Sequence, residues 1–420
     1  MINPNDYTWL KIEPVDAWFF RDGRPSNRGE DQSDLESEFP PNASTVVGAL
    51  RAALARSRGW NGRGSWCDQL KADDNATLGD GFDNLGQLSF LGPLLMQRDE
   101  LQRDELQRDE LQRDELQRDE LLWPMPRHVA GHMVDGRFVP VLLLAPSDAP
   151  VATDIGSVHL PMLPDRWKEQ QARVSGLSDQ QRGRPPEPRS DLWVTSRGMS
   201  KILSGQVPEP ADCRQNDELF ALESRIGIHR PGRPNAGLEG EHTDEAGPSM
   251  YSPRYVRLKP GVALVSGIRG LPPGWPALLP GSTVPGLMPL GGESRLAGVE
   301  MLEHKPKFPE TAPAAGHSVV IAVTPARFAD PWWGADPGDD AGKLSPELSG
   351  RVVTAALDRP RLMGGWNSVK GQPRPLAPFA APGTVWWIRQ ADSAVSGLLQ
   401  LGDNLQTQYG NGLALVAGSE

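Results

Sequence analysis

Arginine and glycine residues occur together at several places in this 420-residue chain, and together they suit the binding of phosphate groups. Arginine supplies a fixed charge and a planar set of donors. Glycine has no Cβ atom, so backbone N–H groups can approach an anion closely. The residues concerned are Arg21, Arg24 and Arg28, then Gly291, Gly292, Arg295, Arg361, Gly364, Gly365, Trp366, Lys370, Gly410 and Gly412. These residue types indicate anion binding rather than acid–base catalysis.

Each of these groups also has a structural explanation. A Gly-Gly pair forms a tight turn more often than a phosphate-binding loop. Glu293 and Arg295 suit an internal ion pair that orders their loop. Trp366 suits a core position as well as a surface on which a base stacks. The loop with Arg21 is equally compatible with a solvated connection, so residue types alone leave both interpretations open.

Short elements flank the first arginine loop. The aromatic run Trp18–Phe20 predicts a buried strand, which the following glycine and proline end. Apolar residues then recur at helical spacing from Val46 to Leu54, which predicts a helix. Ser44 or Thr45 can cap its start and Gly59 can end it. The arginines are therefore expected in a loop between a strand and a helix.

Composition favours a soluble globular chain with room for two domains, since 38% of residues are hydrophobic and 23% charged. The two cysteines cannot form a disulfide framework, so we expect a reducing, cytoplasmic location. No signal peptide or membrane span is expected. The net charge of −11 argues against nucleic acid at first. Residues 351–374, however, have a net charge of +4, and screening limits charge effects to roughly 8–10 Å.

Five copies of QRDEL fill residues 97–121 and supply −5 of the net charge. A five-residue period spreads the leucines around a helix and alternates them across a strand, so neither form builds a core. Asp and Glu precede Arg by four and three residues, which favours a solvated helix or arm. The flanking FLGPLL and LLWPMP segments predict two strands that a single copy could join. A neutral expansion in a surface loop is thus favoured over a partner-docking arm.

Short strands and loops rich in glycine and proline dominate the rest of the chain. Strands are predicted at 139–145, 262–268, 318–324 and 384–389, and loops at 161–188 and 230–252. Because strands do not alternate regularly with helices, we expect an α+β fold with antiparallel sheets. A composition shift at 208–214 marks a weak domain boundary.

Motifs for catalysis and metal binding are weak. His128 and His132 have helical metal-pair spacing, but Pro126 and Gly131 disfavour a helix there and no third ligand is near. The chain has no GxSxG, P-loop or dinucleotide-binding fingerprint. The aspartates in ADPWWGADPGDD lack EF-hand spacing, so a solvated acidic loop is favoured over a calcium site.

Several blocks resemble one family, in the same order along the chain. RDGRP at 21–25, followed by FPP and GALRAAL, resembles its N-terminal signature. Later blocks are ESRIGI at 223–228, GGESR at 291–295, GGW at 364–366 and GNGLALV at 410–416. Together they are similar to the RAMP-superfamily third subunit of the type III-B CRISPR (Cmr) effector complex. Ser26 and Asn411 stand where that family commonly has aromatic residues.

The resemblance implies two ferredoxin-like (RRM-like) domains. These are residues 1–213, with the repeat inserted at 97–121, and 214–420, ending in the glycine-rich loop. It also implies a non-catalytic chain, without metal or cofactor, that recognises the 5′ tag of crRNA in antiviral defence. Its implied protein partners are the large polymerase/cyclase-like subunit and other RAMP subunits. The arginine, glycine, Trp366 and Lys370 positions named above are its implied RNA-binding residues.

Two other functions are compatible with the sequence. Related RAMP proteins are metal-independent endoribonucleases that process crRNA, for which His229 or His304 would be the nearest general acid or base. A carbohydrate- or protein-binding module that uses the 13 tryptophans is the second alternative.

Overall fold

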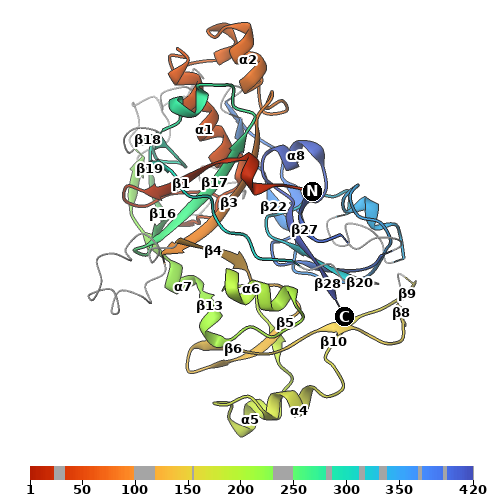
Figure 1. Cartoon of the computed structure of the whole chain (residues 1–420). Coiled ribbons are helices and arrows are strands. Elements are labelled where there is room, and N and C mark those ends of the chain that lie inside the picture. Colours follow the sequence, from red (N-terminus) through yellow and green to blue (C-terminus); the bar gives the residue numbers. More distant parts are fainter. Residues whose placement is uncertain are drawn as a thin grey trace, which may run out of the picture.

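The computed structural model of the chain describes residues 1–22, 34–98, 119–153, 156–229, 249–280, 286–311, 317–330, 338–367, 371–390 and 395–419. Arg24, Arg28, Lys370 and residues 99–118 of the repeat lie outside these ranges. Figure 1 shows a sheet built largely from the first three quarters of the chain beside one built from the last quarter.

Eight of the described strands form the larger sheet, and every neighbouring pair is antiparallel. In spatial order they are β13 (Cys213–Gln215), β12 (Leu192–Thr195), β4 (Asp119–Pro124), β3 (Ser89–Arg98), β17 (Val262–Arg269), β1 (Thr8–Pro14), β19 (Leu296–Met301) and β18 (Gly286–Pro289). Five strands form the second antiparallel sheet: β21 (Arg351–Ala356), β26 (Val385–Arg389), β20 (His317–Ala322), β28 (Leu413–Ser419) and β27 (Gly397–Gln400).

Four strands of each sheet follow the same order. In the larger sheet four neighbouring strands are, in spatial order, β3, β17, β1 and β19. In chain order these are the second, third, first and fourth of the four. In the second sheet β21, β26, β20 and β28 repeat that order. Helix α1 (Ala43–Ser57) connects β1 to β3, which run parallel on either side of β17. The two sheets therefore share a connectivity that the sequence pattern did not reveal.

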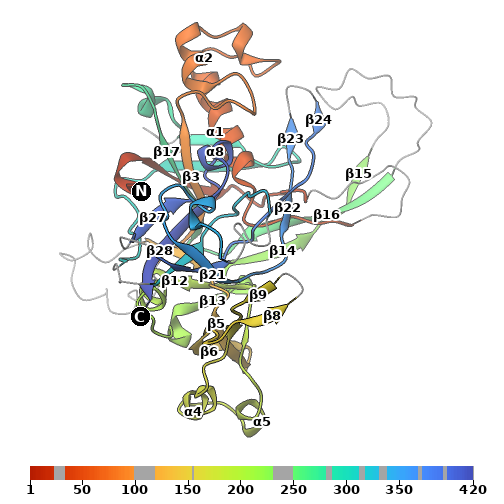
Figure 2. The same cartoon turned by 90° about the vertical axis from the view of Figure 1, so that its right-hand side faces the viewer.

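The remaining described elements are short helices and separate smaller sheets. The other α-helices are α2 (Ala72–Leu78), α4 (Trp167–Ala172), α5 (Asp179–Arg182), α6 (Ser196–Leu203), α7 (Asn216–Leu219) and α8 (Asn404–Gln408). Smaller sheets join β14 (Phe220–Ser224), β16 (Ser249–Leu258), β15 (Gly227–His229) and β2 (Asp34–Leu35), and β11 (Glu187–Pro188), β5 (Val129–Val134) and β6 (Arg137–Leu143). Paired strands are β7 (Ala145–Pro146) with β10 (Pro161–Met162), β8 (Val151–Thr153) with β9 (Gly156–Val158), β22 (Arg361–Met363) with β25 (Ala377–Phe379), and β23 (Trp366–Asn367) with β24 (Gln372–Pro373). The β23–β24 hairpin and the β15–β16 pair project toward the same side in Figure 2.

A single apolar core joins the two sheets. It contains Trp123 of β4 and Leu94 of β3 from the larger sheet, and Trp387 of β26 and Leu415 of β28 from the second. The other face of the larger sheet packs against α1 through a separate core. Because both sheets contribute to one core, removal of apolar surface from water holds them face to face.

Helix α1 confirms the predicted helix and corrects its cap. Val46, Leu50 and Leu54 are fully buried, as their spacing predicts. The cap is Asn42 rather than Ser44 or Thr45, because the Asn42 side chain accepts a hydrogen bond from the Ser44 backbone N–H at 3.0 Å.

Two further predictions are settled by strand pairing. Trp18–Phe20 is buried as expected but forms no regular strand, since only Trp18 makes an isolated bridge to Val256. The segments that flank the repeat do pair as expected, with Arg98 of β3 opposite Asp119 of β4. The predicted strands near 139, 262, 318 and 384 correspond to β6, β17, β20 and β26.

The α+β fold with antiparallel sheets is confirmed. The predicted division at 213–214 falls inside β13, and the sheet that contains β13 continues to β19 at Met301. Among the described residues, no helix is both long and apolar enough to cross a membrane.

The buried His128 gives the fold a predicted acid sensitivity. Its side chain contacts Trp387 edge-on at 5.8 Å, and burial lowers its pKa to about 4 from an ordinary value of 6.5. The neutral form is therefore favoured in the folded state. Above pH 6.5 the side chain is neutral in both the folded and the unfolded chain, so the fold keeps its full stability. As the pH falls toward 4, the unfolded chain takes up a proton that the folded chain excludes, which lowers the free energy of unfolding by roughly 3 kcal/mol.

We expect His128→Phe to reduce the loss of stability between pH 7 and pH 4, measured by urea unfolding. His304→Phe at an exposed position is the control and should follow the wild-type curve. An unchanged pH dependence in His128→Phe would contradict this account.

Candidate nucleic-acid interface

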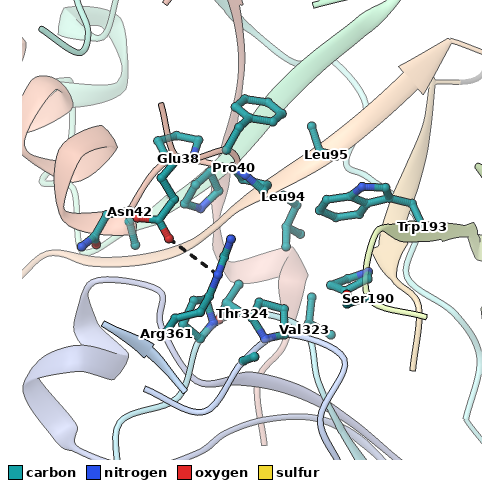
Figure 3. A pocket seen from close by; sticks show the side chains of 18 of the residues that line it. Glu38, Pro40, Asn42, Leu94, Leu95, Ser190, Trp193, Val323, Thr324 and Arg361 are labelled. Carbon is teal, nitrogen blue, oxygen red and sulfur yellow. Dashed lines mark ion pairs between the residues drawn. The ribbon is translucent and has the colours of Figure 1, made fainter. Parts of the chain in front are cut away.

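A cleft of about 340 Å³ opens between the two sheets. One wall is the Glu38–Ala43 segment that leads into α1, together with Leu94 and Leu95 of β3. The opposite wall comes from Val323–Pro325, Arg359, Arg361 and Met363, and Trp193 closes one end (Figure 3). Two further cavities, of about 640 and 230 Å³, share lining residues with it. We call the three together the central groove.

The sequence folds in this way because glycines permit close backbone approach. Gly92 interrupts β3 with a φ of 88°, and Gly410 of the glycine-rich loop packs directly on it. A Cβ atom on Gly410 would lie 2.5 Å from the Gly92 carbonyl oxygen. A Cβ atom on Gly412 would lie 2.1 Å from the carbonyl oxygen of Leu401. The glycine-rich loop thus packs against its own chain beside the groove, and its backbone is buried.

Positive charge exceeds negative charge along the central groove. Among the described residues, its lining contains six arginines, Arg127, Arg189, Arg327, Arg359, Arg361 and Arg374, against three acids, Glu38, Asp191 and Asp358. The rest of the molecule must therefore be more acidic than the net charge of −11 suggests. An anionic ligand is favoured in the groove by this local excess.

Two residues in the cleft each have one buried polar atom without a hydrogen-bond partner among the described residues. Arg127 is 9% exposed and pairs with Asp358 through its Nη2 atom, but its Nε atom has no acceptor. Burial lowers the pKa of Arg127. Asn411 is 1% exposed and donates from Nδ2 to Gln406 Oε1 at 3.0 Å, while its Oδ1 atom has no donor. Buried polar atoms are nearly always hydrogen-bonded, so these two atoms are unusual features of the cleft wall.

Arg361 and Glu38 face each other across the cleft. Their nearest charged atoms are 3.6 Å apart (Figure 3). Burial raises the pKa of Glu38, and Arg361 opposes that rise. The predicted RNA-binding arginine is therefore partly neutralised by an acid from the segment before α1.

The cavity of about 230 Å³ is the most basic part of the groove. Arg327 and Arg374 line it, and none of the described residues of its lining is an acid. The guanidinium carbon of Arg374 lies 3.2 Å from the ring centroid of Phe82, and Phe82 stacks on Tyr409 at 5.1 Å. Asn42 and Ser44 at the start of α1 complete the wall. This cavity suits an anion such as a phosphate group.

The β22–β25 and β23–β24 pairs bring other predicted residues near the groove. Gly364 lines the smallest cavity, and its carbonyl oxygen accepts from Asn42 Nδ2 at 3.4 Å. Gly365 has a φ of 132°. Trp366 is 55% exposed, so it is not a core residue. Arg21 is exposed and bridges to Ser37, which directly precedes the Glu38–Ala43 wall of the cleft.

The predicted Gly291, Gly292 and Arg295 line none of the three cavities. The Gly292 N–H donates to the Phe19 carbonyl oxygen at 2.8 Å, so it is already used. A Cβ atom on Gly291 would lie 2.6 Å from the same oxygen. Arg295 is 3.4 Å from Asp16 and lies over the Tyr255 ring. The Gly-Gly pair therefore forms a tight turn, as expected. Arg295 pairs with Asp16 and not with Glu293 as expected, and Glu293 accepts a hydrogen bond from the Tyr251 hydroxyl at 3.3 Å.

Asp16 connects three arginines from different parts of the chain. Arg225 is 2.9 Å away and Arg257 2.7 Å away, and both also pair with Glu223. Hydrogen bonds from Arg225 and Arg257 lower the pKa of Asp16 to about 2. Sequence reasoning missed Asp16, because nothing local distinguishes it from a solvated loop residue. It also missed Arg127 and Arg327, whose surroundings come from distant segments.

A family model matches nearly the whole chain. The family model described as CRISPR-associated protein (Cas_Cmr3) matches residues 10–418. The chain belongs to that family. The resemblance found in the sequence is thus confirmed, and with it the setting of a type III-B CRISPR effector complex.

Solved structures similar to this chain come from type III complexes. A chain of the type III-B Cmr-beta complex bound to cognate target RNA and AMPPnP is 14% identical, with a TM-score of 0.40, and covers 90% of this chain and 86% of its own length. A chain of the Csm1-Csm4 cassette in complex with pppApA is 11% identical, with a TM-score of 0.31, and covers 95% and 92%. No curated protein sequence matches this chain.

The pairing of Asp16 predicts a pH-dependent effect of its removal. Because its folded pKa lies below the ordinary 3.8, Asp16 stabilises the fold fully above that pH and loses the effect as the pH falls toward 2. We expect Asp16→Asn to lower the melting temperature slightly at pH 5, since the site is partly exposed.

The difference in melting temperature between Asp16→Asn and wild type should narrow as the pH falls from 4 toward 2. Thermal unfolding monitored by circular dichroism measures it. Asp148→Asn, at an exposed position between β7 and β8, is the matched control. A difference that persists at full size at pH 2 would contradict the assignment.

Proposed function

We propose that this chain is the non-catalytic RNA-binding subunit of its effector complex, that it recognises the 5′ tag of crRNA, and that it docks the large polymerase/cyclase-like subunit. The central groove is the proposed RNA site. The observation that supports it most is the excess of arginine along one groove in an otherwise acidic chain. Phosphate contacts dominate the affinity of RNA-binding proteins, so such an excess suits a strand laid along the groove.

The proposed contacts differ along the groove. Arg327 and Arg374 hold a phosphate group at the basic cavity. In the cleft, Arg359 and Arg361 contact the strand from one wall. Trp366 offers a stacking surface beside the groove. The arginine loop at Arg21, Arg24 and Arg28 is proposed to extend the basic surface.

We also propose that the chain consists of two ferredoxin-like units divided within residues 302–316. The repeated strand order of the two sheets supports this division. It replaces 213–214 as the proposed boundary, because β17, β19 and β18 pair back into the first sheet. The central groove then lies between the two units.

We expect Arg327→Ala combined with Arg374→Ala to weaken binding of tag-containing crRNA by roughly 10- to 100-fold. A plot of the logarithm of the binding constant against the logarithm of the salt concentration should also become shallower by about one unit of slope, since fewer counterions are released when a phosphate contact is lost. Fluorescence anisotropy at several salt concentrations measures both quantities.

Arg137→Ala, on the exposed start of β6, removes a charge away from the groove and should leave binding unchanged. Equal affinity of the double variant and this control would contradict the proposed site. RNA without the tag should bind more weakly than tagged RNA and respond less to the groove substitutions.

The non-catalytic role predicts that purified chain leaves CRISPR repeat RNA intact over hours, as judged by gel electrophoresis with end-labelled RNA. Cleavage that is abolished by His229→Ala or His304→Ala, but retained in His159→Ala, would overturn this role in favour of an endoribonuclease. Chelator should be present, so that contaminating metal-dependent nucleases do not contribute.

A further inference from the structure

Arg374 lines the basic cavity of the central groove, and its side chain donates to no acceptor among the described residues. Neither Arg374 nor Arg327, the second arginine of this lining, forms an ion pair in the part of the chain that the structure describes. Burial lowers the pKa of Arg374, and the like charge of Arg327 lowers it further. A long side chain without hydrogen bonds has many rotamers available, so Arg374 needs another contact to hold it toward the cavity.

The ring of Phe82 is that contact. The guanidinium carbon of Arg374 lies over this ring, 3.2 Å from its centroid. A guanidinium is attracted to an aromatic ring through its flat face, while its N–H donors point outward in its plane and stay available. Phe82 is half-buried and lines none of the three cavities. It can therefore act on a bound anion only through Arg374.

Tyr409 fixes the position of Phe82 from the side of the glycine-rich loop. Its ring stacks on the Phe82 ring with a centroid distance of 5.1 Å and an interplanar angle of 29°. Its hydroxyl donates to the Phe82 carbonyl oxygen at 2.7 Å. Tyr409 is 1% exposed, and burial raises its pKa to about 12, so the hydroxyl keeps its proton at neutral pH. Both the ring and the backbone of Phe82 are thus held by one buried side chain.

Arg51 of α1 fixes the same segment from the opposite side. It is 3% exposed, and its guanidinium donates to three carbonyl oxygens of the segment that contains Phe82. The acceptors are Leu78, Gly81 and Asn84, at 2.9, 2.8 and 3.0 Å. Gly79 has a φ of 73°, and a Cβ atom there would lie 2.0 Å from the Asn84 carbonyl oxygen, so the segment closes tightly on itself. We call residues 78–84 the Phe82 loop.

We propose that Phe82 is a positioning residue, which holds the donor edge of the Arg374 guanidinium toward the basic cavity so that it binds a phosphate group. The inference rests on the proposed function in taking that phosphate group to belong to RNA. A binding group that is held in place before the ligand arrives loses less conformational entropy on binding. Asp83, the next residue, is exposed and also favours the charged form of Arg374, so its contribution must be separated from that of the ring.

The first test measures the affinity of the full chain for tag-containing crRNA by fluorescence anisotropy. Phe82→Leu should weaken binding by roughly three- to tenfold, and Phe82→Tyr, which keeps the ring, should restore the wild-type affinity. Trp60→Leu is the matched control, because Trp60 is also half-buried and lies under an arginine, Arg56, at 5.1 Å. Arg56 lines none of the cavities, so this control should bind crRNA as wild type does.

A double-mutant cycle separates positioning from a general structural role. If Phe82 acts through Arg374, Phe82→Leu should cause no further loss of affinity in a chain that already carries Arg374→Ala. A further loss of full size would overturn the proposal. Asp83→Asn should leave the affinity unchanged or raise it slightly. A loss as large as that of Phe82→Leu would assign the positioning to the charge of Asp83 and would also overturn it.

A second measurement needs no RNA. Phenylglyoxal modifies accessible arginines, and peptide mass spectrometry measures its rate at Arg374. Inorganic pyrophosphate should protect Arg374 in the wild-type chain and in Phe82→Tyr, and should protect it several-fold less in Phe82→Leu. Equal protection in all three chains, or protection in none, would contradict the positioning role.

The two measurements also distinguish this inference from the proposed function. If Arg374→Ala leaves crRNA affinity unchanged while protection by pyrophosphate depends on Phe82, the proposed RNA site at this cavity is removed and the positioning role stands. If Arg374→Ala weakens crRNA binding while Phe82→Leu changes neither affinity nor protection, the positioning role is wrong and the proposed function stands.

Discussion

The structure depends on two sheets packed face to face through one apolar core. Trp123 and Trp387 lie in that core from opposite sheets, and the groove opens where its packing ends. The close approach of Gly410 to Gly92 joins the glycine-rich loop to β3 beside this opening. Larger side chains at either position would separate the two backbones. The glycines thus shape the groove mainly by letting its walls meet.

Arginine has several different roles in this chain. Arg51 is buried and donates to the carbonyl oxygens of Leu78, Gly81 and Asn84, so it holds the α2 region against α1. Arg225 and Arg257 pair with Asp16 and Glu223 on the surface. A count of arginines therefore overstates the positive charge available to a ligand. The groove is distinguished because its arginines outnumber the acids beside them.

Local features of the sequence predicted local structure well. The spacing of Val46, Leu50 and Leu54 located α1, and the aliphatic runs near 262 and 318 located β17 and β20. The groove could not be predicted in this way. Arg127 and Asp358 are 231 residues apart in the chain, and their pairing depends on how two sheets pack. Gly292 had the expected turn, but its N–H partner Phe19 could be known only from the fold.

The central claim is that crRNA lies in the groove between the sheets. The most direct measurement is photo-cross-linking of the assembled effector complex with 4-thiouridine placed at single positions of the tag, followed by mass spectrometry of the cross-linked peptides. The account predicts cross-links within residues 38–43, 190–193 and 358–366. Cross-links confined to the turn at residues 291–295, with none in the groove, would contradict it.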